Sequence, residues 1–484
     1  MKRHTMLAAA TLALVTLGCD RAADRLTGAG VPQLNAARSV NQNIGINVLL
    51  AAAPTAAQLA ELGTYGKVSG RLIEINAVFM RASVSQLPAI QALPFVLAAN
   101  PDAERQGSPV DAVAVADFAG GLNTWNLDAV NVTDLITGPA PDRTIGFDGS
   151  GVYIGVLDTG LLDSWRQYFP QERIATQFAK AFSGGGQNQG SVSEPTNQWE
   201  HDQNSHGTHV TSTILGYSLF GTPINGVAPK ATVIPVKVLN QAGFGWSSMV
   251  AAGIVYIGNL KRTGALGSAP VVINMSLGGS QLDAVEKGAI DFAIAQGVII
   301  VAAAGNGGNN GMSFPGAYEP VISAAASGWV GEWKTCPPGS LNFRNWWRLC
   351  DVADPTNPDD FYITSFSSRE RTDQDLDVVA PGSWVVGPFQ LQSGKISYFF
   401  LGGTSMASPH VAGIVALMAQ TKNDLTASEA ETILEATAIS LPAGSRSIRQ
   451  PNGVTNVEFT WGTDATGAGL VRADAAVAAA AALP

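Results

Sequence analysis

The chain has 484 residues, of which 46% are hydrophobic and 14% are charged. This length and composition can build a large buried core, and they exclude a disordered chain and a single small domain. The formal net charge is −10 and no run of Lys or Arg occurs, which argues against a nucleic-acid partner.

The first 19 residues have the features of an export signal. A short basic region precedes an apolar stretch at residues 6–17, which is too short for a permanent membrane-spanning helix. The stretch ends in Thr16-Leu17-Gly18-Cys19, which resembles a bacterial lipobox although Thr16 stands where Leu is usual. Two alternatives follow: a cell-envelope lipoprotein with lipid on Cys19, or an ordinary secreted protein.

The cysteine count fits export. If Cys19 is lipidated or removed, Cys336 and Cys350 remain as an even pair, which in an oxidising compartment predicts a disulfide worth about 3 kcal/mol. Two free thiols are the alternative. No Cys-x-x-Cys or His-rich cluster indicates zinc.

Residues 20–105 predict a flexible spacer and then a small domain. The spacer, residues 20–42, is small and polar. The domain, residues 43–105, has strand patterns at 44–50, 68–81 and 95–99 and helix patterns at 55–62 and 84–93. With two strands within 68–81, the order is β-α-β-β-α-β, the ferredoxin-like arrangement. Taken alone, it indicates a binding module or a folding aid.

Residues 106–122 are rich in Gly, Ala, Ser, Asp and Val. They predict an exposed linker of the kind at which proteolysis concentrates.

The region 123–484 predicts an α/β domain. Short, almost wholly apolar strand patterns lie at 152–157, 232–239, 271–275, 298–303 and 321–325, and helix patterns lie at 206–215, 247–260 and 284–296. Such an alternation indicates a parallel sheet covered by helices on both faces. In these sheets functional groups gather at the carboxyl ends of the strands.

Three polar residues stand at or near those ends: Asp158, His206 and Asn306. Each has an ordinary explanation, since Asp and Asn often close turns after strands. His206 and His209 could together suggest a metal site, but no Glu or further His follows at ligand spacing.

A fourth candidate is Ser405 in the stretch Gly402-Gly403-Thr404-Ser405-Met406. The glycines form a tight turn that delivers the serine to the start of a helix, and the apolar run at 411–418 places that helix in the core. Unpaired N–H groups and the positive helix end there favour a negative oxygen. An N-cap serine is the alternative for this motif taken alone.

Four blocks together resemble the signatures of the subtilisin-like serine proteases. They are Val-Leu-Asp-Thr-Gly at 156–160, His-Gly-Thr-His-Val at 206–210, Ala-Ala-Gly-Asn at 303–306 and Gly-Thr-Ser-Met-Ala-Ser-Pro-His at 403–410. They occur in the family's order of Asp, His and Ser. The resemblance runs from about residue 125 to the C-terminus, where residues 469–475 are similar to the family's closing segment.

The resemblance implies peptide hydrolysis by a catalytic triad. His206 would take the proton of Ser405 and pass it to the leaving amine, while Asp158 would orient the imidazole. The side-chain amide of Asn306 and the N–H of Ser405 would bind the oxyanion, and losing one such donor costs about 100- to 1,000-fold in rate, a figure from a member of this family.

The resemblance also implies where substrate binds. An extended peptide would pair with two edges, formed by Ser276, Leu277 and Gly278 and by Gly243, Phe244 and Gly245. The walls of the P1 pocket would come from residues 302–305, including Ala303, Ala304 and Gly305, and from Leu277 and Gly278. Gly307 and Ser313 would shape the pocket without a carboxylate, which predicts broad specificity with a preference for large apolar P1 side chains.

The small domain is similar to the family's inhibitory propeptide of the I9 type. This implies a proenzyme whose residues 43–105 help the catalytic domain fold, bind it in cis as an inhibitor, and are removed by self-cleavage between Pro101 and Asn123. The expected partners are protein or peptide substrates, the chain's own propeptide and, through a lipid on Cys19, a membrane.

Two departures from the family stand out. Residues 327–364 form an insertion with four tryptophans and both remaining cysteines, which predicts a stapled surface loop with its own aromatic core or, alternatively, an aromatic subsite or docking surface. Residues 216–222 lack the Asn that relatives use in a strong calcium site. No metal ligand and no required cofactor are therefore predicted, and calcium elsewhere stays open.

Two other functions fit the same sequence. One is a catalytically silent peptide-binding protein that keeps the fold, and the other is an enzyme that cleaves only its own propeptide. The presence of Asp158, His206, Ser405 and Asn306 together favours a general endopeptidase.

Overall fold

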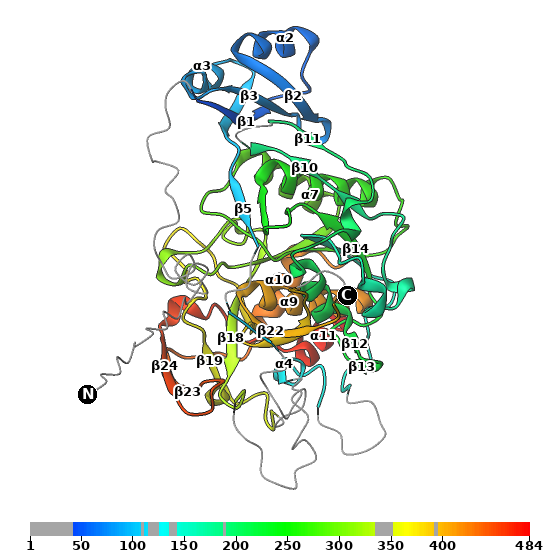
Figure 1. The fold of residues 1–484 in the computed structure, drawn as a ribbon, viewed down its shortest axis with the longest axis vertical. Coiled ribbons are helices and arrows are strands. Elements are labelled where there is room, and N and C mark those ends of the chain that lie inside the picture. Colours follow the sequence, from blue (N-terminus) through cyan, green and yellow to red (C-terminus); the bar gives the residue numbers. More distant parts are fainter. Residues whose placement is uncertain are drawn as a thin grey trace, which may run out of the picture. The chain divides into compact units, whose positions relative to one another are not determined.

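The computed structural model describes residues 42–107, 111–114, 125–134, 143–186, 190–333, 352–391 and 395–484 (Figure 1). All described residues belong to one compact unit. The predicted signal, the spacer up to residue 41 and the lipidation site, together with Cys336, Cys350, Trp346 and Trp347, lie outside the described residues. Within the described ranges, no helix has both the length and the hydropathy needed to cross a membrane.

The small N-terminal domain has the predicted β-α-β-β-α-β order. Its elements are β1 (Asn43–Leu50), α2 (Ala56–Tyr65), β2 (Gly66–Leu72), β3 (Ala77–Ser83), α3 (Leu87–Gln91) and β4 (Val96–Pro101). The strands form an antiparallel sheet in the order β2-β3-β1-β4. Thr55 and Gln58 form a capping box that fixes the start of α2. The second helix is shorter than predicted, because residues 84–86 form a separate 3₁₀ turn.

The large domain is built on a mainly parallel sheet, in the order β19-β18-β17-β16-β8-β14-β9, with β20 also paired to β18. This confirms the predicted fold class. The strands are β8 (Tyr153–Asp158), β9 (Lys180–Ala181), β14 (Thr232–Lys237), β16 (Val271–Met275), β17 (Val298–Ala303), β18 (Ile322–Trp329), β19 (Phe361–Ile363) and β20 (Val378–Pro381).

Alternate strand residues face two apolar layers, because successive side chains of a strand point to opposite faces. Val272, Ile299 and Val301 pack with helices α6 (His206–Leu215), α9 (Thr404–Thr421), α10 (Ala427–Thr437) and α11 (Ala473–Ala481). Ile273 and Ile300 pack with α7 (Ser247–Arg262) and α8 (Ala284–Ala295) on the other face. Both faces are thus covered by helices, as the apolar strand patterns predict.

Smaller elements surround this core. They are α4 (Trp125–Ala129), β10 (Ser183–Gly184), β11 (Val192–Ser193), β12 (Tyr217–Leu219), β13 (Thr222–Ile224), β15 (Phe244–Trp246), β21 (Val385–Pro388), β22 (Tyr398–Gly402), β23 (Gly444–Arg449) and β24 (Asn456–Trp461). The small domain adds to the second apolar layer, since Ala77 and Phe79 of β3 join the cluster around α7 and α8.

The predicted linker is not irregular throughout. Its first residue, Gln106, closes a short strand β5 (Glu104–Gln106), which pairs with β15. Residues further on form β6 (Asp111–Ala114), which pairs with β22. Both pairings are antiparallel and join the predicted linker to the large domain. The predicted linker therefore contains residues in paired strands, and Gly107 within it is buried.

The predicted insertion begins and ends as part of the fold. Residues 327–329 continue β18 and pair with β19. Trp329 is only 6% exposed and packs in the same core cluster as Trp125 and Trp461. Trp333 packs edge-on against Trp384 and Phe400. Trp329 and Trp333 therefore pack against residues outside the insertion, in two different core clusters, and the predicted separate aromatic core is wrong for the described part of the insertion.

Candidate active site

The predicted catalytic residues come together on one edge of the large sheet. Asp158 is the last residue of β8, and His206 is the first residue of α6. Ser405 is the second residue of α9, which directly follows β22 and Gly403. The first sixteen residues of α9, Thr404 to Ala419, are all buried. The apolar body of α9 thus fixes the serine, as the sequence predicts.

Asp158 and His206 form a buried hydrogen-bonded pair. Nδ1 of His206 lies 2.8 Å from Oδ1 and 3.0 Å from Oδ2 of Asp158, and both residues are fully buried. Because an ionised carboxylate only accepts, Nδ1 carries the proton and Nε2 is the basic atom. Close approach of α6 to β8 requires Gly207, since a Cβ there would lie 2.3 Å from the carbonyl oxygen of Gly160.

Ser405 is bound to the end of β16 rather than to His206. Its hydroxyl donates to the carbonyl oxygen of Ser276 at 3.1 Å, and the Ser276 hydroxyl donates back to the Ser405 carbonyl at 2.8 Å. Nε2 of His206 has no hydrogen-bond partner among the residues that the structure describes. The predicted bond between serine and histidine is therefore not formed in this structure. Rotation about the Cα–Cβ bond of Ser405 is the movement that redirects its hydroxyl.

Asn306 is oriented by Thr404. Its Oδ1 accepts from the backbone N–H of Thr404 at 2.9 Å and from the Thr404 hydroxyl at 3.0 Å, which leaves Nδ2 to face Gly403. A Cβ on Gly403 would lie 3.5 Å from Nδ2 of Asn306 and 3.6 Å from the backbone nitrogen of Ser405. Both predicted oxyanion donors therefore lie beside Gly403, whose positive φ of 149° favours glycine.

The two predicted substrate-binding edges hold a segment of the chain itself. Strand β5 pairs with β15 on one side, and Gln106 exchanges two hydrogen bonds of 3.0 Å with Gly278 on the other. The N–H of Gly107 then donates to the carbonyl of Gly243 at 3.0 Å. Leu277 lies between the paired Gly278 and Ser276 and is buried. Residues 104–107 thus lie between both edges as an added strand.

At Gly107 the strand formed by residues 104–107 lies next to the predicted catalytic residues. A Cβ on Gly107 would lie 3.4 Å from Cε1 of His206 and 2.9 Å from the Ser276 carbonyl oxygen that binds the Ser405 hydroxyl. Any side chain at this point of the strand therefore faces the imidazole. Residues 108–110, which follow, lie outside the described residues.

The predicted P1 walls are close to Ser313. A Cβ on Gly278 would lie 2.7 Å from Cβ of Ser313, and one on Gly305 would lie 2.9 Å from it. The backbone of Ala304 accepts from Ser313 N at 2.8 Å, and Ala303 pairs in register with Ala324 of β18. Gly307 donates its N–H to the Ser368 hydroxyl at 3.1 Å. These residues include no carboxylate.

The other histidines of the motifs are structural. Nε2 of His209 donates to the carbonyl of Val385 at 3.0 Å, and burial lowers the pKa of His209 to about 3. His410 lies between the Met406 carbonyl and Asn126, and burial lowers its pKa to about 4. The contacts of His206 and His209 thus run to different groups, Nδ1 of His206 to Asp158 and Nε2 of His209 to a backbone carbonyl.

Sequence reasoning missed several residues that position the site. Asn274 donates to the Ser276 hydroxyl at 3.1 Å and accepts from the Ser408 hydroxyl at 2.7 Å, which joins β16 to the first turns of α9. Thr404 orients Asn306, as described above. A sequence signal was present, because Thr404 and Ser408 lie within the block 403–410 and Asn274 lies two residues before the predicted edge residue Ser276.

A group of three carboxyls lies elsewhere in the large domain. One ligand atom each of Asp375, Asp377 and Glu431 lies within 4.8 Å of the others. Burial raises the pKa of Asp377 to about 8 and that of Glu431 to about 7. Carboxylates are hard-cation ligands, so this group has the spacing to hold a metal ion. The sequence prediction named no metal ligand.

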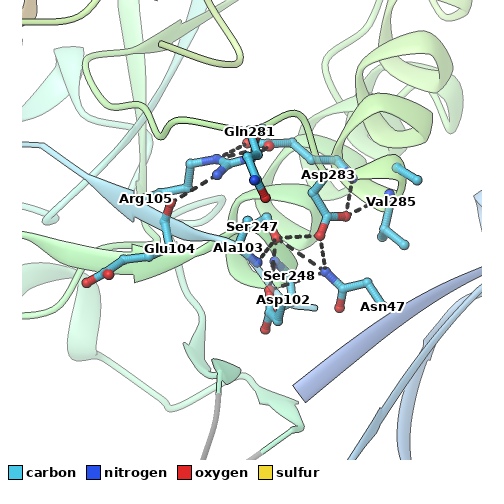
Figure 2. A network of polar contacts seen from close by, with 12 residues as sticks. Asn47, Asp102, Ala103, Glu104, Arg105, Ser247, Ser248, Gln281, Asp283 and Val285 are labelled. Atoms are coloured by element: carbon cyan, nitrogen blue, oxygen red, sulfur yellow. Dashed lines mark hydrogen bonds and ion pairs between the residues drawn. The ribbon is translucent and has the colours of Figure 1, made fainter. Parts of the chain in front are cut away.

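A polar network joins the small domain to the large one (Figure 2). Asp102, which follows β4, accepts from the backbone N–H of Ser248 at 3.0 Å and from the Ser247 hydroxyl at 2.9 Å, both in the first turn of α7. Asp283, the N-cap of α8, accepts from Nδ2 of Asn47 at 2.8 Å. Two carboxylates therefore share one buried site at two helix N-termini.

This network predicts a pH dependence of stability. Burial and then the charge of Asp102 raise the pKa of Asp283 above its ordinary 3.8, and Glu286 and Arg105 face the same site. A carboxyl whose folded-state pKa is raised destabilises the fold as pH rises from its unfolded value through the folded value. In a proteolytically inactive Ser405→Ala background, we expect the melting temperature of Asp283→Asn minus that of its parent to become more positive as the pH rises from 4 to 8. Thermal unfolding followed by circular dichroism measures it, and a difference that stays constant or falls contradicts the argument.

The large domain, which carries the predicted catalytic residues, is similar to known proteins. Residues 149–470 match the Subtilase family, peptidase S8. The chain is 32% identical over 317 residues to Subtilisin DY of Bacillus licheniformis, an alignment covering 65% of this chain and 92% of that protein. It is 30% identical over 272 residues to Thermitase of Thermoactinomyces vulgaris, covering 56% and 76%.

A solved structure shares the fold. It is fervidolysin from Fervidobacterium pennivorans, described as a keratinolytic enzyme related to subtilisin, with a TM-score of 0.59 and 22% identity. The match covers 91% of this chain and 62% of the fervidolysin chain, so this chain spans less than two thirds of that protein's length.

Proposed function

The chain belongs to the subtilase family and is a serine endopeptidase acting on protein or peptide substrates, and we propose that Asp158, His206 and Ser405 are its catalytic triad. The observation that carries the proposal is the buried pair of Asp158 and His206, on the same sheet edge as a serine at a helix N-terminus. Labelling of Ser405 by a fluorophosphonate, located by mass spectrometry, tests it. A chain that is not labelled and does not digest casein is instead the silent peptide-binding protein.

The proposed mechanism follows from the proton positions. Nε2 of His206 removes the Ser405 proton as Oγ attacks the substrate carbonyl, and the imidazolium that forms is stabilised by Asp158. His206 then gives the proton to the leaving amine, and the same cycle with water releases the acyl group. These steps use only side chains and water, so we propose that no cofactor is required.

Asn306 would stabilise the oxyanion. Asn306→Ala should lower kcat by about 100- to 1,000-fold with KM changed little, because the amide contacts a charge that develops only in the transition state. Steady-state hydrolysis of a peptide nitroanilide measures both constants. Asn452→Ala, in the loop between β23 and β24, is the control. A large rise in KM at unchanged kcat would mean that Asn306 binds the ground state instead.

The P1 pocket would accept large apolar side chains. The absence of a carboxylate among Ala303, Ala304, Gly305, Gly278 and Ser313 supports this. Peptide nitroanilides that differ only in P1 should be cleaved faster with Phe or Leu than with Arg or Glu, by about 10-fold or more. A clear preference for Arg contradicts the assignment.

The small domain would be a propeptide removed by self-cleavage. Support comes from residues 104–107, which lie along the substrate edges, and from β6, which pairs with the strand leading to Ser405. From these pairings we propose that, within the window 101–123 predicted from the sequence, the processed bond lies between Gly107 and Asp111. We also propose export, with lipidation of Cys19 or ordinary secretion as the two routes. Intact mass of the exported protein distinguishes them and reports the Cys336–Cys350 bridge.

A further inference from the structure

A buried ion pair joins the strand between the substrate edges to a helix of the large domain (Figure 2). The side chains of Arg105 and Glu286 are both 0% exposed. Nε of Arg105 donates to both carboxylate oxygens of Glu286 at 3.0 Å, and Nη2 contacts Oε2 as well. Nη2 also donates to the carbonyl of Gln281 at 2.9 Å. This pairing through two guanidinium nitrogens is geometrically specific for arginine.

The acceptor side of this pair belongs to the large domain. Glu286 is the third residue of α8, and Asp283 caps the same helix. Gly279 makes room for the guanidinium, since a Cβ there would lie 2.6 Å from Nη1 of Arg105. All of these groups follow β16 and form a pocket directly beyond the edge residue Gly278. The groups that bind the Arg105 guanidinium therefore belong to the large domain.

The strand pairing determines which side chain enters the pocket. Along residues 104–107, Glu104 and Gln106 are exposed whereas Arg105 and Gly107 are buried, as expected for alternating side chains of an extended strand. Gly107 lies beside His206. Any extended peptide bound along the same two edges therefore points a side chain at Glu286 two residues before the one beside the imidazole.

We propose that Glu286 forms a subsite that selects a basic side chain, Arg above Lys, at the substrate position two residues before the one that lies beside His206. The inference rests on the proposed function and extends it from the P1 pocket to a second position. A substrate with an uncharged side chain there leaves a buried carboxylate without its cation, which is strongly unfavourable. The chain's own Arg105 is then a substrate-like occupant of this subsite.

The test uses the self-processed enzyme and three tetrapeptide nitroanilides. Arg-Gln-Gly-Phe reproduces the order at residues 105–107 with an apolar P1 residue, citrulline replaces Arg with an uncharged isostere, and Leu replaces it with an apolar side chain. For the wild type we expect kcat/KM to be at least about 30-fold higher with Arg than with citrulline, because one partner of a buried charged pair is lost. Equal rates with Arg and citrulline overturn the proposal, and this comparison needs no variant.

Two variants assign the effect to Glu286. Glu286→Gln should bring the ratio of Arg to citrulline within about 3-fold. The Leu peptide should be cleaved at least as fast as by the wild type, because no buried carboxylate is then left without its cation. Glu458→Gln, an exposed residue of β24, should keep the wild-type ratio. An Arg preference that survives in Glu286→Gln overturns the proposal.

A readout without catalysis separates this inference from the proposed function. In the Ser405→Ala chain, Arg105→Ala empties the pocket, and ethylguanidinium should raise the melting temperature whereas uncharged ethylurea should not. Adding Glu286→Gln should abolish the shift. If no peptide is cleaved and Ser405 is not labelled, the proposed function fails, while a charge-specific shift still supports the subsite. Equal shifts of the melting temperature with ethylguanidinium and ethylurea overturn the proposed subsite.

Discussion

Ser405→Ala should lower kcat for peptide hydrolysis by about 10⁶-fold, a loss known from a member of this family. The expected size follows from the role of the hydroxyl, because without Oγ no acyl-enzyme forms and water must attack unaided. The remaining rate would come from substrate binding and the oxyanion donors. Active-site labelling and nitroanilide hydrolysis of the purified variant measure the effect. Ser445→Ala, an exposed serine of β23, should retain full activity.

The same variant tests self-processing. Purified Ser405→Ala should remain uncleaved between Gly107 and Asp111, and intact mass reports this directly. If the purified variant is cut at the same bond as the wild type, processing is not autocatalytic. If Ser405→Ala still hydrolyses the peptide nitroanilide within about 10-fold of the wild-type rate, Ser405 is not the nucleophile.

Asp158→Asn should lower kcat by about 10⁴-fold with a nearly intact structure. In the wild type the carboxylate accepts from Nδ1 of His206 at 2.8 Å, which leaves Nε2 as the base. An Asn side chain can present its NH₂ group to Nδ1, which favours the tautomer with the proton on Nε2, and an imidazole in that form cannot deprotonate Ser405. The imidazolium also loses its counter-charge.

The chain offers a matched control for this variant. Asp163 and His201 form another Asp–His pair at 2.8 Å, but their side chains are 69% and 51% exposed. Asp163→Asn should change kcat/KM by less than about 2-fold, since exposed pairs contribute little. Comparable losses in both variants would show a general charge effect in place of a triad.

The sequence predicts the fold well where the pattern is simple. Continuous apolar runs such as 271–275 and 298–303 became β16 and β17 with the predicted bounds. A short apolar run that is buried on both faces is compatible with few structures other than a central strand of a parallel sheet. The helix 206–215 was also predicted with its observed ends, because Gly216 follows it and the polar residues Asn204 and Ser205 precede it.

Long-range contacts account for most of what the sequence could not predict. The pairing of residues 104–107 with both edges depends on distant strands, and nothing local in Glu104-Arg105-Gln106-Gly107 predicts a strand. Glu286 is one of many acidic residues on helices, and only the structure places it against Arg105. The Ser405 hydroxyl was expected to face His206, but the choice between two nearby acceptors is a rotamer preference that no motif encodes.

The antiparallel pairing of β5 with β15 has a consequence for how activity depends on concentration. While residues 104–107 remain covalently joined to the large domain, they compete for the cleft as an intramolecular ligand, at an effective concentration that for short tethers reaches the millimolar range. After cleavage the released piece competes only at its bulk concentration. Diluting a freshly processed sample should therefore raise the activity per molecule, whereas diluting the uncut chain should leave it unchanged.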